Sequence, residues 1–180
     1  FTDTAAYFLT VNPAGNNKRL VPVSNSIPVG VGPEPYFMHT AGIYPNESIH
    51  LGPYVGSVSE AAISASYEMG EGWTSNEITE NKTRTFPLRG LFPFTGAGAP
   101  AMQIKMNVVG NSPNSRTVRT RLNNTDIFNT ALGGFAYAKW SVNQPISILT
   151  GATENIAVSN VTSLPNNRIK MGLFEITYPR

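Results

Sequence analysis

Residues 102–108 of this chain read MQIKMNV, and residues 118–122 read VRTRL. In both stretches, side chains that suit a core alternate with polar or charged ones, which is typical of a β-strand with one buried face. A shift of one residue would exchange the two faces, so the alternation fixes the register strongly. The buried residues are expected to be Met102, Ile104, Met106, Val118 and Leu122, and the exposed ones Lys105, Arg119 and Arg121.

The two strands are separated by residues 110–115, which read GNSPNS. All of these residue types favour turns and loops. The sequence therefore predicts that the two strands form an antiparallel hairpin.

Similar short stretches recur along the whole chain, separated by turn-forming residues. Residues 57–66 are compatible with a strand or a single helical turn, and no other segment shows a helical period. The series predicts an all-β fold, an antiparallel, jelly-roll-like β-sandwich of about ten strands. The further strands are expected at residues 5–11, 19–23, 36–40, 63–67, 83–88, 136–142, 146–149, 156–161 and 168–178.

The last of these strands changes phase. Its apolar residues occupy odd positions up to Leu173 and even positions from Phe174 onward, with Glu175 on the opposite face. A β-bulge near Gly172 explains this change, and burial of the strand on both faces is the alternative. We favour the bulge.

Composition supports one folded β domain. The chain has 180 residues, with 41% hydrophobic residues, 16 Gly and 14 Pro, and only 13% are charged. This apolar content can offset the ordering entropy, which argues against disorder. We expect a single domain over residues 1–180, and apolar strands at both ends suggest a domain excised from a larger exported protein.

Several classes of partner and cofactor are disfavoured. The net charge is +2, and the only basic cluster is Arg116, Arg119 and Arg121, so no nucleic acid is expected. The absence of cysteine removes disulfides, thiolate nucleophiles and Cys-based zinc sites. The sequence contains no apolar stretch of about 18 residues, so no membrane span is expected. Cys-free β domains of this composition favour a secreted or cell-surface location.

No catalytic constellation is evident. The only histidines are His39, expected to be packed in a strand or at its edge, and His50, expected in a loop with Glu47 as the one nearby carboxylate. Their spacing fits no metal motif. The acidic residues are too scattered for a glycosidase pair. We expect no catalytic residue, metal or cofactor in this segment, and no hydrolytic activity.

Residues 70–73 read GEGW and hold the candidate ligand-binding residues, Trp73 and Glu71. Trp73 either fills a pocket at the end of the sandwich or is displayed on a loop, where it could stack on a sugar ring. We favour the buried plug, and we expect Trp140 in or near the core.

A resemblance is carried by five motifs in order: YFL at 7–9, KRL at 18–20, YFMHT at 36–40, GEGW at 70–73 and EITYPR at 175–180. With these motifs the chain resembles the β-rich region that precedes the caspase-like catalytic domain of gingipain-like, C25-type peptidases of the Bacteroidetes. That group includes the sortase-like surface peptidase of the type IX secretion system. The catalytic His and Cys of the family match nothing in this chain. The resemblance implies that the catalytic domain begins after Arg180.

Three functions follow from the sequence. The first is a non-catalytic structural or interaction domain of an exported gingipain-like surface peptidase, which braces or presents the adjacent catalytic domain or contacts other surface proteins. The second is a carbohydrate-binding module that would use Trp73 on a glycan. The third is a viral coat-like jelly roll with apolar surfaces for self-association.

Overall fold

The computed structural model describes residues 14–15, 30, 32–52, 70 and 72–180. The chain divides into two units, residues 1–33 and 34–180, and every described strand lies in the second. The strands expected at 5–11, 19–23 and 63–67, and the ambiguous segment 57–66, lie outside the described residues. The expectation of one domain over residues 1–180 stays a prediction.

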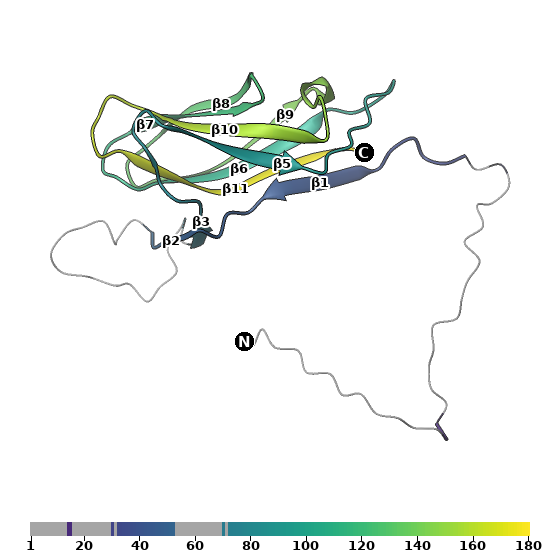
Figure 1. Ribbon diagram of the computed structural model, residues 1–180, viewed down its shortest axis with the longest axis horizontal. Helices are drawn as coiled ribbons and strands as arrows, with labels where there is room; N and C mark the ends of the chain where they lie inside the picture. The colour runs from purple at the N-terminus through teal and green to yellow at the C-terminus, as the bar shows by residue number, and fades with distance from the viewer. Residues whose placement is uncertain (1–13, 16–29, 31, 53–69, 71) are drawn as a thin grey trace. The chain divides into compact units, whose positions relative to one another are not determined.

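Two antiparallel sheets form a sandwich, which confirms the predicted fold class (Figure 1). The first sheet has the order β1-β11-β6-β9, with β4 paired to the start of β11, and the second has the order β5-β10-β7-β8. A separate ribbon joins β2 and β3. The strands are β1 (Met38–Ile43), β2 (Ser48–His50), β3 (Gly72–Thr74), β4 (Ile78–Thr79), β5 (Thr83–Arg89), β6 (Met102–Gly110), β7 (Arg116–Leu122), β8 (Thr125–Leu132), β9 (Tyr137–Gln144), β10 (Thr153–Val161) and β11 (Arg168–Pro179).

The core lies between the two sheets and is built by the alternation seen in the sequence. All five residues expected to be buried in β6 and β7 are fully buried, and Lys105 and Arg119 are exposed as expected. Arg121 differs, because it is half-buried and pairs with Asp126, with 2.8 Å between Nε and Oδ1. Trp140 is partly buried against the core, with its ring 5.6 Å from that of Phe128.

The predicted hairpin between β6 and β7 is wrong. β6 pairs with β11 and β9, whereas β7 pairs with β10 and β8, so residues 111–115 cross from one sheet to the other. Arg116 holds this crossing from inside: its guanidinium donates to the carbonyl oxygens of Ser112, Gly133 and Gly134 and to Oδ1 of Asn167. The hairpin partner of β7 is β8, joined through Asn123, whose φ of 53° suits a tight turn.

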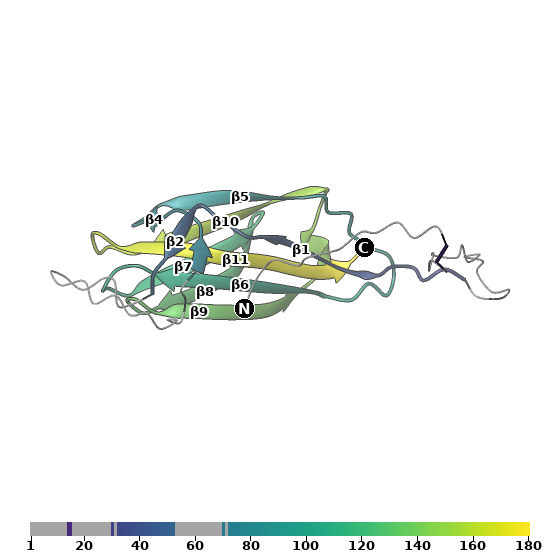
Figure 2. The same cartoon turned by 90° about the horizontal axis from the view of Figure 1, so that it is seen from below.

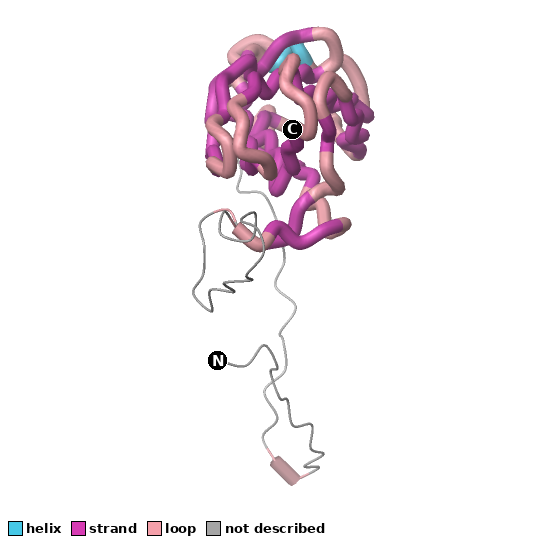
Figure 3. The backbone as a smooth tube through the Cα atoms, turned by 90° about the vertical axis from the view of Figure 1, so that its left-hand side faces the viewer, coloured by secondary structure: helices cyan, strands magenta, loops and turns pink. Residues whose placement is uncertain are grey.

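The strand expected at 146–149 is also wrong. Residues Ile146–Ile148 form a short 3-10 helix, the cyan segment of Figure 3. Pro145 begins it and cannot donate to a sheet, while the amides of Ile148 and Leu149 bond to the carbonyls of Pro145 and Ile146. Apolar spacing alone could not separate these two structures.

The predicted bulge in β11 is confirmed. The register of β11 against β6 shifts between Met171 and Leu173, which places the irregularity at Gly172. Before the bulge the strand is also covered on both faces, because Lys170 is buried on the side opposite Ile169 and Met171. Seen from below the first sheet, the ribbon of β2 and β3 lies over this part of β11 (Figure 2).

Candidate binding site

The ribbon of β2 and β3 carries Trp73 and is fixed to the outer face of the first sheet. Trp73 pairs with Ile49 in the ribbon, and the Thr74 hydroxyl donates to the Ser48 carbonyl at 3.2 Å. The next residue, Ser75, anchors the ribbon to β11: its amide donates to the Met171 carbonyl at 2.8 Å, and its Oγ accepts from the Met171 amide at 3.0 Å. The backbone under Trp73 is therefore held in one place.

The backbone conformation explains why both Gly positions of the GEGW motif are glycine. Gly70 and Gly72 have φ values of 89° and 139°, a region that other residues rarely adopt. A Cβ on Gly70 would also lie 3.0 Å from both Tyr137 Cβ and Val109 Cγ1, too close for ordinary packing. These glycines let the chain pass close over the sheet. Glu71, the other candidate ligand-binding residue, lies outside the described residues.

A pocket of about 340 Å³ lies between the ribbon and the outer face of the first sheet, and we call it the Trp73 pocket. Its floor is formed at the bulge of β11, where Leu173 lies beside Asn107 of β6 and Asn107 lies opposite Lys139 of β9. Tyr137 of β9 forms a further wall beside Trp73.

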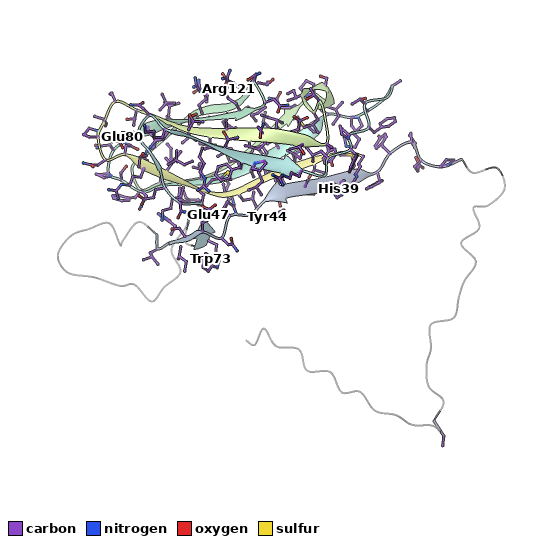
Figure 4. The ribbon with its side chains drawn as sticks, viewed as in Figure 1. His39, Tyr44, Glu47, Trp73, Glu80 and Arg121 are labelled. Carbon is purple, nitrogen blue, oxygen red and sulfur yellow. The ribbon has the colours of Figure 1, made fainter. Side chains whose placement is uncertain are left out.

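The predicted burial of Trp73 is wrong, since 60% of its surface is exposed. Figure 4 shows Trp73 on the outer side of the ribbon, away from the two sheets. The residues that line the Trp73 pocket include Tyr137, Asn107 and Lys139, and the exposed Trp73 indole lies on the outer side of the ribbon beside it. This combination of aromatic and polar residues suits a polar ligand that has an apolar face.

Sequence reasoning did not identify Tyr137, Asn107 and Lys139 as site residues. Alternation does place Asn107 on the outer face of its strand, opposite Met106 and Val108. What the sequence did not reveal was the pairing of β6 with β9, which brings Asn107 and Lys139 together.

A second surface, which we call the Phe37 surface, lies where β1 begins and β11 ends. Phe37 and Phe92 are exposed by 60% and 59%, and the Arg180 guanidinium lies 5.0 Å above the Phe92 ring. The Phe37 and Arg180 backbones exchange two hydrogen bonds, of 3.0 and 2.8 Å. Tyr36 stacks on Phe94 beside them, with 5.3 Å between ring centroids. These are residues of the YFMHT and EITYPR motifs and of the β5–β6 connection.

His39 is a packed histidine, as expected. Its ring makes edge contacts with Phe37 and with buried Tyr178, and its Nε2 lies 3.4 Å from Arg180 Nη1. Neither a carboxylate nor a nucleophile is bonded to it in the described part of the chain. A basic and aromatic environment of this kind has no general-base geometry.

The sequence predicted His50 in a loop, and this is wrong. His50 lies in β2, where only 3% of its surface is exposed. Glu47 binds Arg84 rather than His50. Both carboxylate oxygens of Glu47 accept hydrogen bonds from the Arg84 guanidinium, at 2.6 and 2.7 Å, which lowers the pKa of that carboxyl. Burial, helped by the nearby charge of Lys170, lowers the pKa of His50, and Glu77 opposes the shift. These causes favour the neutral form of His50.

The described residues show neither the side-chain cluster of a metal site nor a membrane-spanning helix. Within residues 32–52 and 72–180, no three His, Cys, Asp or Glu side chains are grouped as a metal site would require. No described helix is long and apolar enough to cross a membrane.

Comparison with solved structures finds similar folds at low identity. Dimeric latent PorU from Porphyromonas gingivalis has 10% identity and a TM-score of 0.47 over 81% of this chain and 13% of that chain. The CBM36-1 domain of a multidomain xylanase from the hindgut metagenome of Trinervitermes trinervoides has 10% identity and a TM-score of 0.44 over 78% and 96%. A CBM36 carbohydrate-binding module in complex with calcium and xylotriose has 10% identity and a TM-score of 0.42 over 78% and 98%.

The chain thus spans a small part of the PorU chain and nearly the full length of the two modules. No protein-family model and no curated protein matches the sequence.

Proposed function

We propose that this chain is a non-catalytic interaction domain of an exported gingipain-like surface peptidase, and that it braces the adjacent catalytic domain. The observation that carries the proposal is the Phe37 surface. Exposed aromatic rings beside an arginine are the composition found at the energetic centres of protein interfaces. The sequence resemblance supplies the partner, and it implies a secreted or cell-surface location.

The Phe37 surface is also preorganised. The Phe94 amide donates to the Pro179 carbonyl at 2.9 Å, so the β5–β6 connection is tied to the end of β11. Arg180 is held by Phe37 through the backbone and lies over Phe92. A partner that docks here would order few additional groups, which reduces the entropic cost of binding.

The test mixes this chain with a separately produced catalytic domain of the parent peptidase and measures affinity by calorimetry. We expect the double variant Phe37→Ser, Phe92→Ser to weaken binding by at least about a hundredfold, because two exposed anchors are lost. The control is Leu164→Ser, which removes an exposed apolar side chain in the β10–β11 loop, at the opposite end of β11. Equal affinity of the double variant and the unmodified chain would contradict the proposal.

The Trp73 pocket favours a second candidate function, carbohydrate binding. Trp73 gives an exposed ring on which a sugar could stack, and Asn107 and Lys139 supply hydrogen-bond donors on the floor. This site is on the outer face of the first sheet, whereas the Phe37 surface is at its end. The two functions can therefore coexist. No observation favours the viral coat-like hypothesis.

For this candidate we expect Trp73→Ala to leave the melting temperature nearly unchanged, because the side chain is largely exposed. Affinity for a glycan identified on an array should fall by at least about tenfold. The matched control is Phe92→Ala, since Phe92 is an aromatic residue of almost the same exposure, 59% against 60%. A glycan array without any binder, or unchanged glycan affinity in Trp73→Ala, would remove this candidate.

A further inference from the structure

A second pocket, of about 440 Å³, lies at the end of the first sheet where β11 begins, and we call it the Lys170 pocket. It is bounded by β2, the β6–β7 connection and the first residues of β11. Its lining includes three basic side chains, His50, Arg168 and Lys170, and no acidic one.

Lys170 is the central cation. Its residue is only 7% exposed, and its ammonium donates to Ser48 Oγ at 2.9 Å. Within the described residues it forms no ion pair. A lysine that is buried to this extent gains from an opposite charge near its ammonium, and the ammonium has further N–H donors to give.

Arg116 lies directly behind the pocket wall and adds a second buried positive charge. It is 4% exposed, and its bonded partners in the described region are carbonyl, amide and hydroxyl oxygens rather than carboxylates. Its Nη2 donates to Ser112 Oγ, which also accepts from the Arg168 amide. With both acceptor positions used, the Ser112 hydroxyl has its own hydrogen to donate, and Ser112 lines the pocket.

Two more donors face the same space. The His50 ring is buried beside Lys170, and no hydrogen bond to it occurs among residues 32–52 and 72–180. The Arg168 guanidinium makes one long contact, 3.6 Å from Nε to Glu77 Oε2, while Glu77 also accepts from the Asn111 amide at 2.6 Å. Glu77 does not line the pocket.

We infer that the Lys170 pocket is an oxyanion-binding site, which takes a carboxylate or sulfate group of a small ligand between Lys170, Arg168 and Ser112. An oxyanion accepts several hydrogen bonds and supplies the negative charge that two buried cations lack. No carboxylate lines the pocket itself, and the Glu77 carboxylate beside it is already bonded to Asn111 and in contact with Arg168. Neither the Trp73 pocket nor the Phe37 surface is part of this site.

The experiment titrates the full chain by calorimetry with acetate, glucuronate, sulfate and phosphate, each against chloride at equal ionic strength. We expect saturable binding of at least one oxyanion, and the anion that saturates at the lowest concentration identifies the ligand group. Lys170→Met and Arg168→Gln should each weaken this binding by at least about tenfold. Lys105→Met, which removes an exposed lysine from β6, should leave it unchanged.

Folding is checked by the melting temperature of each variant. Arg168 has a side chain that is 43% exposed, so Arg168→Gln decides the test if Lys170→Met does not fold. The inference is overturned if no oxyanion binds better than chloride. It is also overturned if the folded Lys170 or Arg168 variant binds as tightly as the unmodified chain.

Discussion

His50 shows how a single buried residue makes the stability of this fold depend on pH. Burial comes first among the causes that lower its pKa below the ordinary 6.5, the charge of Lys170 adds to the effect, and Glu77 opposes it. In the unfolded chain His50 takes up a proton near pH 6.5, whereas in the folded chain it resists protonation. The unfolded state therefore binds more protons below that pH, and stability falls as the pH decreases.

We predict that the free energy of unfolding falls as the pH is lowered from about 7.5 to 5.5, by no more than about 1.4 kcal/mol per pH unit from this residue. Urea unfolding across this range measures the slope. His50→Gln should flatten it, and His39→Gln controls for the loss of the other imidazole. An equally steep slope in His50→Gln would show that other groups cause the pH dependence.

Trp73 and Arg116 show the limits of sequence reasoning at the scale of one residue. A tryptophan after Gly-Glu-Gly was expected to be buried, but Trp73 is exposed. The basic cluster of Arg116, Arg119 and Arg121 gave no expectation of a buried arginine, but Arg116 is buried. Residue type gives only an average burial, and here tertiary pairing decided it. Arg116 finds four carbonyl or amide acceptors within the β6–β7 crossing, the β8–β9 connection and Asn167. Those acceptors come from segments far apart in sequence.

At the scale of elements, the sequence predicted strands well where alternation was strict. β5, β6, β7, β10 and β11 lie close to their expected bounds, and the bulge at Gly172 was visible as a change of phase. The sequence did not predict β8, because its apolar residues Ile127 and Phe128 are adjacent rather than alternating. Partners were harder to predict than strands, since a long loop between two strands is equally compatible with a hairpin and with a crossing between sheets.

The candidate sites were hard to predict for the same reason, because they depend on which strands pair. Both pockets are assembled from the ribbon of β2 and β3 and from strands of the first sheet, so they depend on pairings that local pattern does not encode. The motif GEGW marked Trp73 correctly as unusual, yet its pocket required the contact of β6 with β9 and β11. Lys170 was hidden in a regular strand, where alternation gave no reason to expect a buried ammonium.

For the whole molecule, stability depends on the contact between the two sheets, and Met106 lies at that contact. It is fully buried on β6 of the first sheet, and its sulfur accepts a hydrogen bond from the Thr120 hydroxyl on β7 of the second, at 3.2 Å. Thr120 is itself fully buried. A substitution at Met106 should therefore affect the packing of both sheets.

We predict that Met106→Ala lowers the free energy of unfolding by about 2–5 kcal/mol, because it removes buried methylene groups and leaves a cavity between the sheets. Met106→Leu keeps nearly the same volume and should cost less than about 1.5 kcal/mol. Both variants remove the sulfur acceptor of Thr120, so the difference between them isolates the cavity. Denaturant unfolding with an unchanged m-value measures that difference. If the two variants were equally stable, the prediction would be wrong, because the space around Met106 would then collapse readily around the smaller side chain.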